Sequence, residues 1–208
     1  MGALKYSGQQ KSGEYMSENA REAILASARK AAQLHGYSGI NFRTIAEDVG
    51  IKNASIYYHF RSKADLGAAV AKRYREDTAA VLETLRGEHA DPADCLTCYP
   101  QIFRMSLENG NRLCLSSFMA AEHEDLPDEV KREVRAFADV NVSWLADVLS
   151  AAGLQDAEAC KRRALAIFTA VAGAQLIART RADIGLFDQL VASYRESGLV
   201  STANRSAE

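Results

Sequence analysis

The segment IKNASIYYHF at 51–60 brings hydrogen-bonding side chains of several kinds into one short stretch of chain. A lysine, an asparagine and a serine precede two adjacent tyrosines and a histidine, and the cations Arg61 and Lys63 follow directly. Hydroxyl, amide and cationic groups together can bind the phosphates and base edges of a nucleic acid. The same groups could form an active site or a protein interface. The choice depends on the elements that present these side chains.

Composition excludes several other functions. The 208 residues are 48% hydrophobic and 25% charged, and no apolar run approaches the roughly 20 residues that a membrane span needs. Four cysteines (Cys95, Cys98, Cys114 and Cys160) are too few for a disulfide scaffold, and without an export signal we expect a cytoplasmic protein. The Cys95-x-x-Cys98 pair lacks a second pair of ligands, so we expect neither a metal site nor a cofactor. No nucleophile–base pair, phosphate loop or HExxH stretch indicates an enzyme.

Charge is distributed unevenly along the chain. Residues 1–63 hold nine Lys and Arg against five Asp and Glu, whereas the overall net charge is −2. The front of the chain is therefore basic and the rear acidic. This asymmetry predicts that a polyanion, if the protein binds one, contacts the N-terminal third.

The period of the apolar residues predicts an all-α fold of about nine helices. Asn41 and Ser62 are expected to cap the helices that follow them, and Gly36 and Gly50 to end the helices before them. Pro100 should kink or end its helix. We expect residues 1–16 to be a flexible basic arm and 201–208 a frayed tail. The predicted helices cover about 17–35, 42–49, 54–60, 62–86, 91–108, 112–122, 126–153, 156–182 and 183–196.

Residues 42–60 are predicted to form a helix-turn-helix. The small side chain of Ala46 lets the second helix cross close to the first, and Gly50 permits the positive φ that the turn needs. The apolar side chains expected to face inward are Ile45, Val49, Ile51 and Ile56. The side chains left pointing outward are Lys52, Asn53, Ser55, Tyr58 and His59. This arrangement favours a surface that contacts a DNA groove.

The string RTIAEDVGIKNASIYYHFRSKADL resembles the DNA-binding signature of the TetR family of bacterial repressors. The resemblance covers about residues 17–75, and the rear half matches only in helical layout and length. One departure is Ala54, where the family often has glycine. The resemblance implies a DNA-binding domain over 17–63 and an effector-binding and dimerisation domain over 64–200. A homodimer would place its recognition helices about 34–36 Å apart on palindromic double-stranded DNA.

The resemblance also implies roles for individual residues of the DNA-binding domain. Tyr57 resembles the family's phosphate-binding tyrosine, while Tyr58 and His59 would divide between thymine-methyl and phosphate contacts. Arg43 and Lys63 resemble clamps on the DNA backbone. The residues that would open the recognition helix and reach base edges and phosphates are Lys52, Asn53, Ala54 and Ser55. In the alternative, Tyr57 or Tyr58 packs beneath the helix over 62–86.

The resemblance implies that the helices over 156–182 and 183–196 form the dimer interface. Small residues at three- and four-residue spacing allow close helix packing on the first of them, and an apolar stripe follows on the second. The alternative is ordinary packing within one subunit. The interface candidates are Ala166, Ala170, Gly173, Ala174, Ile177, Phe187, Leu190, Val191 and Tyr194.

The resemblance implies an effector pocket between the middle helices, and the aromatic and methionine residues there favour a small apolar or aromatic effector. The candidate lining is Tyr99, Phe103, Cys114, Phe118, Met119, Trp144 and Phe168, each of which could instead be plain core. Cys114 resembles a cysteine found in members of the family that respond to electrophiles or oxidants. We therefore hypothesise a sensing thiol at Cys114, with a small buried hydrophobe as the alternative.

The prediction is a DNA-binding transcriptional regulator, a homodimeric repressor released from a palindromic operator by a small-molecule effector or by thiol modification. Two alternatives stay open. One is a small-molecule-binding or metabolic protein whose helix-turn-helix is incidental. The other is a constitutive DNA-binding protein with no effector.

Overall fold

The fold is all-α, as predicted. The computed structural model describes residues 7–154 and 156–200, and these contain ten α-helices and two short 3-10 helices. The helices are α1 (Ser7–His35), η1 (Tyr37–Gly39), α2 (Phe42–Val49), α3 (Asn53–His59), α4 (Lys63–Glu88), α5 (Pro92–Cys98), α6 (Gln101–Glu108), α7 (Leu115–Ala121), η2 (His123–Asp125), α8 (Asp128–Ala151), α9 (Ala157–Arg181) and α10 (Ile184–Glu196).

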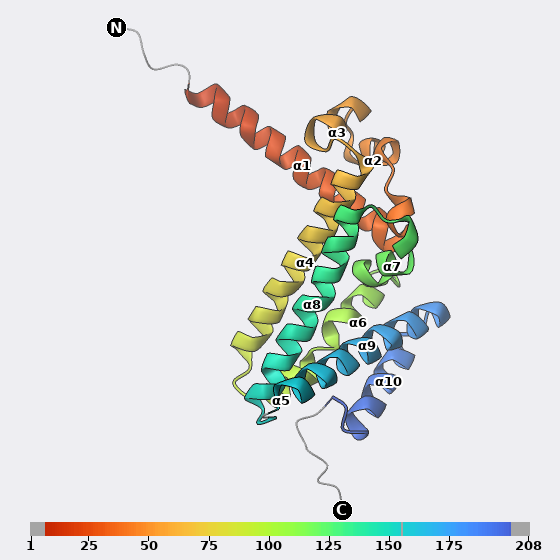
Figure 1. Cartoon of the computed structure of the whole chain (residues 1–208). Helices are drawn as coiled ribbons and strands as arrows, with labels where there is room; N and C mark the ends of the chain where they lie inside the picture. The colour runs from red at the N-terminus through yellow and green to blue at the C-terminus, as the bar shows by residue number, and fades with distance from the viewer. Residues whose placement is uncertain (1–6, 155, 201–208) are drawn as a thin grey trace, which may run out of the picture.

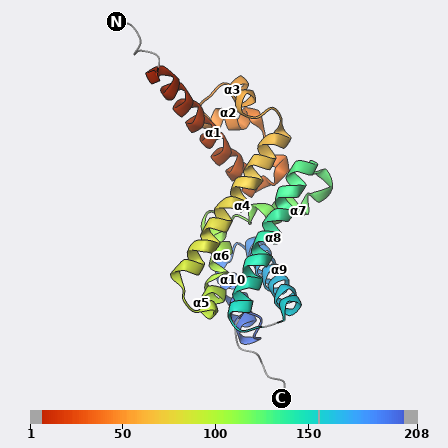
Figure 2. The same cartoon turned by 60° about the vertical axis from the view of Figure 1, so that its left-hand side comes forward.

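The molecule is elongated, with the short helices α2 and α3 at one end beside α1 (Figure 1). The long helix α4 runs from this end along the body of the protein, and α8 packs beside it along most of its length (Figure 2). Helices α9 and α10 pack on each other and close the opposite end. Helix α4 therefore connects the helix-turn-helix directly to the rest of the chain.

Local capping sets the ends of α2 as predicted. The Asn41 side chain accepts hydrogen bonds from the backbone amides of Arg43 and Thr44 at 2.9 and 3.2 Å, which satisfies two otherwise unpaired donors of the first turn. Gly50 ends the helix in the left-handed region with φ 75°, a conformation that costs glycine little. These two contacts fix the length of α2 and the direction in which the chain leaves it.

Helices α4 and α5 begin close to the predicted positions. Ser62 caps α4 by accepting from the amide of Asp65 at 3.0 Å. Asp91 caps α5 by accepting from the amide of Ala93 at 2.8 Å, with a proline at the first helical position. The predicted break at Pro100 separates α5 from α6 and accounts for the helix beyond the nine expected.

Two helix boundaries differ from the sequence prediction. Helix α1 begins at Ser7, so residues 7–16 are helical instead of a flexible arm, and residues 1–6 and 201–208 lie outside the described residues. The segment 7–16 contains no proline and several good helix formers, so a helix is compatible with its sequence. Helix α7 begins at Leu115, three residues later than expected. Tertiary hydrogen bonds from Asn111 and Cys114 hold the preceding segment in a non-helical conformation.

Two hydrogen bonds from α9 hold the segment before α7. The backbone amide of Cys114 donates to the Gln175 side chain at 2.9 Å. The Asn111 side-chain amide donates to the carbonyl of Arg179 at 3.1 Å. Because these groups are satisfied by α9, the segment has less to gain from extending the helix by another turn.

Candidate nucleic-acid interface

The helix-turn-helix packs around the side chains that the sequence placed inward. Ile45, Ala46 and Ile56 are buried, and Val49 and Ile51 are half-buried at the edge of the same cluster. Phe60, at the end of α3, is also buried. Helix α3 is too short to be stable alone, so this packing is what holds it in place.

The opposite side of α3 is exposed to solvent. Lys52, Asn53 and Ala54 are exposed, and Ser55 is half-buried. The exposed fraction is 55% for Tyr57 and 80% for Tyr58. The alternative in which a tyrosine packs beneath α4 therefore does not describe Tyr58. Hydroxyl, amide and ammonium groups lie together on one accessible surface, at the end of the molecule that Figure 1 labels α3.

The aromatic residues of α3 are held by edge-on ring contacts. The ring of Tyr57 lies 4.9 Å from that of Phe42 in α2, and the ring of Tyr58 lies 5.1 Å from that of His59. Partial burial lowers the pKa of His59 below its ordinary value, and the nearby cation Arg21 lowers it further. His59 is therefore neutral at neutral pH, when its ring can both donate and accept a hydrogen bond.

The two predicted backbone clamps occupy different environments. Arg43 is exposed and forms a surface ion pair with Glu47 at 3.2 Å, one turn along α2. Such exposed pairs contribute little, so Arg43 can exchange this partner for a phosphate. Lys63 instead donates from Nζ to the carbonyl of Ser38 at 3.1 Å and lies 4.6 Å from the centre of the Tyr37 ring. In this structure Lys63 supports η1.

Glu122 connects the rear half of the chain to the DNA-binding half. The backbone amide of Tyr37 donates to Glu122 Oε2 at 2.5 Å, and that of Ser38 donates to Oε1 at 3.2 Å. A Cβ at Gly36 would displace this carboxylate, and the φ of 70° there favours glycine. Sequence reasoning assigned Gly36 only as a helix end and missed Glu122, because no local pattern marks a contact between residues so distant in the chain.

We expect Glu122→Ala to destabilise the protein by about 1–3 kcal/mol, because the amides of Tyr37 and Ser38 lose their carboxylate acceptor. Urea unfolding measures the free energy, and hydrogen exchange at the two amides reports the local effect. Glu124→Ala is the matched control, since Glu124 is an exposed glutamate in η2. Equal unfolding free energies for the Glu122 and Glu124 variants would contradict a structural role for this contact.

The predicted effector-pocket residues form a packed aromatic core. The ring of Tyr99 lies 5.7 Å from Phe103 and 5.9 Å from Trp144, and the rings of Phe103 and Phe168 are 6.2 Å apart. Tyr99 is fully buried and donates its hydroxyl to Asn141 Oδ1 at 2.9 Å. Burial raises the pKa of Tyr99 well above its usual value, so this hydroxyl stays a donor.

The remaining pocket candidates are also engaged in packing. Cys114 and Met119 are buried, and the guanidinium of Arg179 lies 4.8 Å from the centre of the Phe118 ring. The described part of the chain has a cavity of about 550 Å³, but it lies between α1, α4 and α6, and none of the predicted pocket residues lines it. Tyr99, Phe103 and Trp144 are therefore core in this structure, while Phe118 and Phe168 are half-buried.

The predicted dimer surface is only partly exposed in the subunit. On α9, Ala166, Gly173 and Ile177 are exposed and Ala170 is half-buried, and no neighbouring atom lies within 4 Å of a Cβ built at Gly173. Leu165 and Leu176 lie on the same face of α9 with exposed fractions of 54% and 48%. Sequence reasoning missed these two leucines because it followed the small residues.

Three interface candidates belong to the core of the subunit instead. Ala174, Phe187 and Val191 are buried within the chain. Helix α10 packs mainly on α9, with Phe187 and Val191 in the core. A bidentate ion pair between Arg104 of α6 and Asp188 of α10 joins Nε to Oδ1 at 2.8 Å and Nη2 to Oδ2 at 3.0 Å and adds a contact to α6. Leu190 and Tyr194 stay half-buried at the edge of the core.

No helix among residues 7–154 and 156–200 is both long and apolar enough to cross a membrane. Within the same residues, no cluster of three or more His, Cys, Asp or Glu side chains is arranged to hold a metal ion.

A helix-turn-helix with an exposed polar recognition helix, joined by a long helix to an all-helical body, defines the class of helix-turn-helix regulators. Residues 24–70 match the family described as bacterial regulatory proteins, tetR family. The crystal structure of a TetR transcriptional regulator from Legionella pneumophila superposes on this one with a TM-score of 0.80. The match has 30% sequence identity and covers 85% of this chain and 96% of that chain. The protein belongs to the TetR family.

Two further comparisons agree with this assignment. A TetR-family regulator from Agrobacterium tumefaciens is 28% identical with a TM-score of 0.80, over 87% of this chain and 98% of that one. The HTH-type transcriptional repressor AcnR of Corynebacterium efficiens is 39% identical over 67 residues, which are 32% of this chain and 34% of that protein. The chain thus matches about a third of the length of this relative.

Proposed function

We propose that the protein is a homodimeric transcriptional repressor that binds a palindromic double-stranded DNA operator and leaves it when a small-molecule effector binds. The observation that carries this proposal is the exposed polar surface of α3, whose apolar side is fixed against α2. The identified relative AcnR is itself described as a repressor. Binding of α3 in the major groove is the mode in which a helix-turn-helix reads DNA.

The proposed contacts divide between phosphates and bases. Lys52 and Arg43 are exposed cations on either side of the turn, suited to phosphate oxygens. Tyr57 and Tyr58 supply hydroxyls for the same purpose. Asn53, at the first position of α3, is placed to donate and accept at a base edge. Phosphate contacts set the register of the protein on DNA, and base contacts supply sequence preference.

The exposed apolar face of α9 supports the proposed dimer. Leu165, Leu176 and Ile177 are each about half exposed and lie beside the small residues Ala166 and Gly173. Large apolar side chains that recur on one helix face are costly in water, and a second copy of this face would cover them. Twofold pairing through this face would provide two copies of α3 for a palindromic site.

The proposed function is tested by a mobility-shift titration with duplex DNA taken from upstream of the protein's own gene and containing a palindrome. We expect a specific complex that weakens steeply as salt increases, because neutralised phosphates release counterions. A duplex of the same composition with the palindrome scrambled is the control. Equal binding to both duplexes would reject an operator-specific repressor. Loss of the complex on addition of a compound library then distinguishes an effector-controlled repressor from a constitutive DNA-binding protein.

We expect the wild type and Cys114→Ser to respond to quinone or hypochlorite in the same way, because the Cys114 side chain is only 1% exposed. Its position at the start of α7 is fixed by the hydrogen bond from its amide to Gln175. The measurement is the fraction of DNA bound before and after oxidant, in the wild type and the variant. Oxidant-dependent release that the serine variant loses would instead support a sensing thiol.

A further inference from the structure

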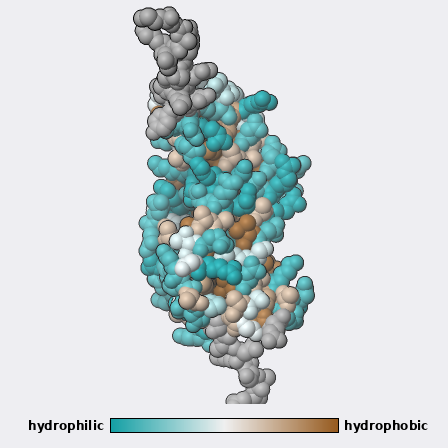
Figure 3. Space-filling model, turned by 90° about the vertical axis from the view of Figure 1, so that its left-hand side faces the viewer, coloured by the Kyte–Doolittle hydropathy of each residue, from teal (hydrophilic) through white to brown (hydrophobic). Residues whose placement is uncertain are grey.

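The cavity between α1, α4 and α6 joins the DNA-binding half of the chain to the rear half. Its volume is about 550 Å³, comparable to that of small-molecule sites in proteins. Figure 3 shows one face of the molecule, on which apolar residues are exposed in small patches within a largely hydrophilic surface. Two of the largest exposed apolar side chains, Val81 and Met105, line the cavity with exposed fractions of 42% and 59%.

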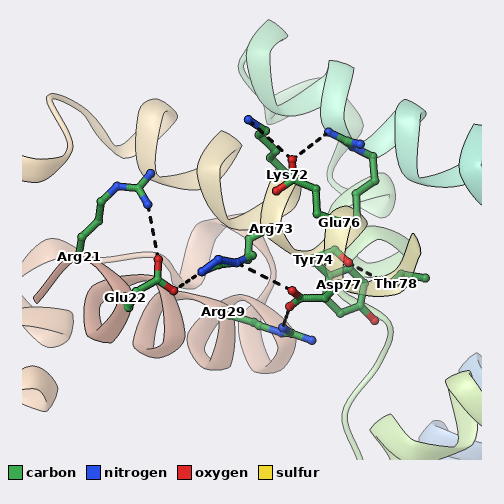
Figure 4. Close-up of polar contacts among 10 residues, drawn as sticks. Arg21, Glu22, Arg29, Lys72, Arg73, Tyr74, Glu76, Asp77 and Thr78 are labelled. Atoms are coloured by element: carbon green, nitrogen blue, oxygen red, sulfur yellow. Dashed lines mark hydrogen bonds and ion pairs between the residues drawn. The ribbon is translucent and has the colours of Figure 1, made fainter. Parts of the chain in front are cut away.

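One wall of the cavity is an ion-pair network between α1 and α4 (Figure 4). Arg29 of α1 pairs with Asp77 of α4 at 2.6 Å, and Arg73 of α4 pairs with Glu22 of α1. Arg73 also lies 3.9 Å from Asp77. Both acidic residues that line the cavity, Glu22 and Asp77, are therefore ion-paired with arginines that also line it.

Two further cations that line the cavity have no such partner. Arg112 has no ion pair or side-chain hydrogen bond within the described residues, although its Nε atom is buried. Lys30, on α1, likewise lacks an acidic partner in that part of the chain. The lining therefore has an excess of positive charge, which favours an anion in the cavity.

An unpaired amide supplies an independent sign of a ligand. Gln33 lines the cavity and is only 7% exposed, and its side chain has no hydrogen-bond partner among residues 7–154 and 156–200. On the same lining the Nε atom of Arg112 is buried without a partner, which is uncommon and costs free energy, so the two side chains point to a group that pairs with both. A carboxylate matches the guanidinium in geometry and accepts from the amide.

We infer that this cavity binds a small carboxylate with an aliphatic body, and that this compound is the effector of the proposed repressor. The carboxylate lies at Arg112 and Gln33, with Lys30 nearby. The aliphatic body lies against the apolar lining, which comprises Leu25, Val70, Val81, Ile102 and Met105. This identification of the effector site rests on the proposed function.

The position of the cavity gives the compound a route to the DNA-binding surface. Helix α1 packs against α2, and α4 follows directly from α3, so a ligand between α1 and α4 contacts both supports of the helix-turn-helix. The Arg29–Asp77 and Arg73–Glu22 pairs bridge the same two helices and must adjust if the helices separate. The carboxylate releases DNA because it binds the separated arrangement more tightly than the DNA-bound one.

Isothermal titration calorimetry of the full chain with octanoate tests the binding site. 1-Octanol is the uncharged control, and inorganic phosphate is the control anion that lacks an aliphatic chain. We expect octanoate to bind at least about tenfold more tightly than either. Arg112→Gln should weaken the affinity for octanoate about tenfold or more, whereas Arg132→Gln, at an exposed arginine of α8, should leave it unchanged. Ala26→Phe, which fills the cavity from α1, should abolish octanoate binding. This second variant tests the site if Arg112→Gln does not fold.

Equal affinity for octanoate and 1-octanol, or for octanoate and phosphate, overturns the inference, as does octanoate binding that survives both cavity variants. The mobility shift is then repeated with octanoate. Specific DNA binding that octanoate does not reduce rejects the effector assignment and leaves the repressor proposal standing. Absence of specific DNA binding without octanoate rejects the repressor proposal, while the titration still decides whether the cavity binds a carboxylate.

Discussion

Lys52→Ala is expected to weaken operator binding by about 1.5–3 kcal/mol in each subunit, as for a lost hydrogen bond to a charged group, and so by about 3–6 kcal/mol in a dimer that carries the change twice. Lys52 is exposed at the N-terminal end of α3, where its ammonium group can reach a phosphate. A lost phosphate contact should weaken binding to all sequences alike. It should also reduce the slope of log affinity against log salt by about one per subunit.

Asn53→Ala should differ from Lys52→Ala in kind. If Asn53 reads a base edge, its loss relaxes the preference at that base pair and leaves the salt dependence unchanged. Fluorescence anisotropy with a set of single-base operator variants, at several salt concentrations, measures both effects. Lys161→Ala is the control, since Lys161 is an exposed lysine of α9, a helix at the opposite end of the molecule from α3 (Figure 1). Operator affinity for the Lys52 variant equal to that of the Lys161 variant would reject α3 as the DNA-contacting helix.

The elements of the DNA-binding half could be predicted because their signals are local. Asn41 caps α2 through side-chain contacts two and three residues away, and Gly50 ends it by its own backbone freedom. The alternation of inward apolar and outward polar residues around Ile56 then follows from helix geometry alone. Each of these features depends on a window of only a few residues.

The functional surfaces of the rear half depend on contacts between distant segments. An aromatic side chain such as Tyr99 has the same sequence signal whether it lines a cavity or fills a core. The exposed leucines of α9 could not be distinguished from Ala174, because apolar residues occur on more than one face of that helix. The unpaired state of Gln33 could not be predicted, since it depends on which neighbours fail to reach it.

The cavity and the core also differ in what their polar groups do. Asn141 is fully buried, but it accepts from Tyr99 and donates to the carbonyl of Phe137 at 2.9 Å, so its amide is satisfied within the chain. Gln33 is 7% exposed and has no such partner among the described residues. The contrast separates a polar group that stabilises the fold from one available to a ligand. Gln175 is of the first kind and carries the largest stability effect that we expect.

Gln175→Leu is expected to lower the free energy of unfolding by about 2–5 kcal/mol, as two buried hydrogen bonds are lost without a large change in volume. Gln175 is fully buried in α9, where its Oε1 accepts from the amide of Cys114 at 2.9 Å and its Nε2 donates to the carbonyl of Phe103 at 2.6 Å. Leucine leaves the amide of Cys114 without its acceptor and removes the side-chain donor to the carbonyl of Phe103.

The segment before α7 should then lose its present non-helical conformation, since the Gln175 contact competes with continuation of that helix. Urea unfolding measures the stability, and hydrogen exchange at Cys114 reports the local change. Gln189→Leu, at an exposed position of α10, is the matched control and should change stability little. Gln175→Glu should be at least as destabilising as leucine, because a carboxylate cannot donate to Phe103 and its charge would be buried. If the leucine variant were as stable as the Gln189 control, these hydrogen bonds would not be what joins α9 to α6 and α7.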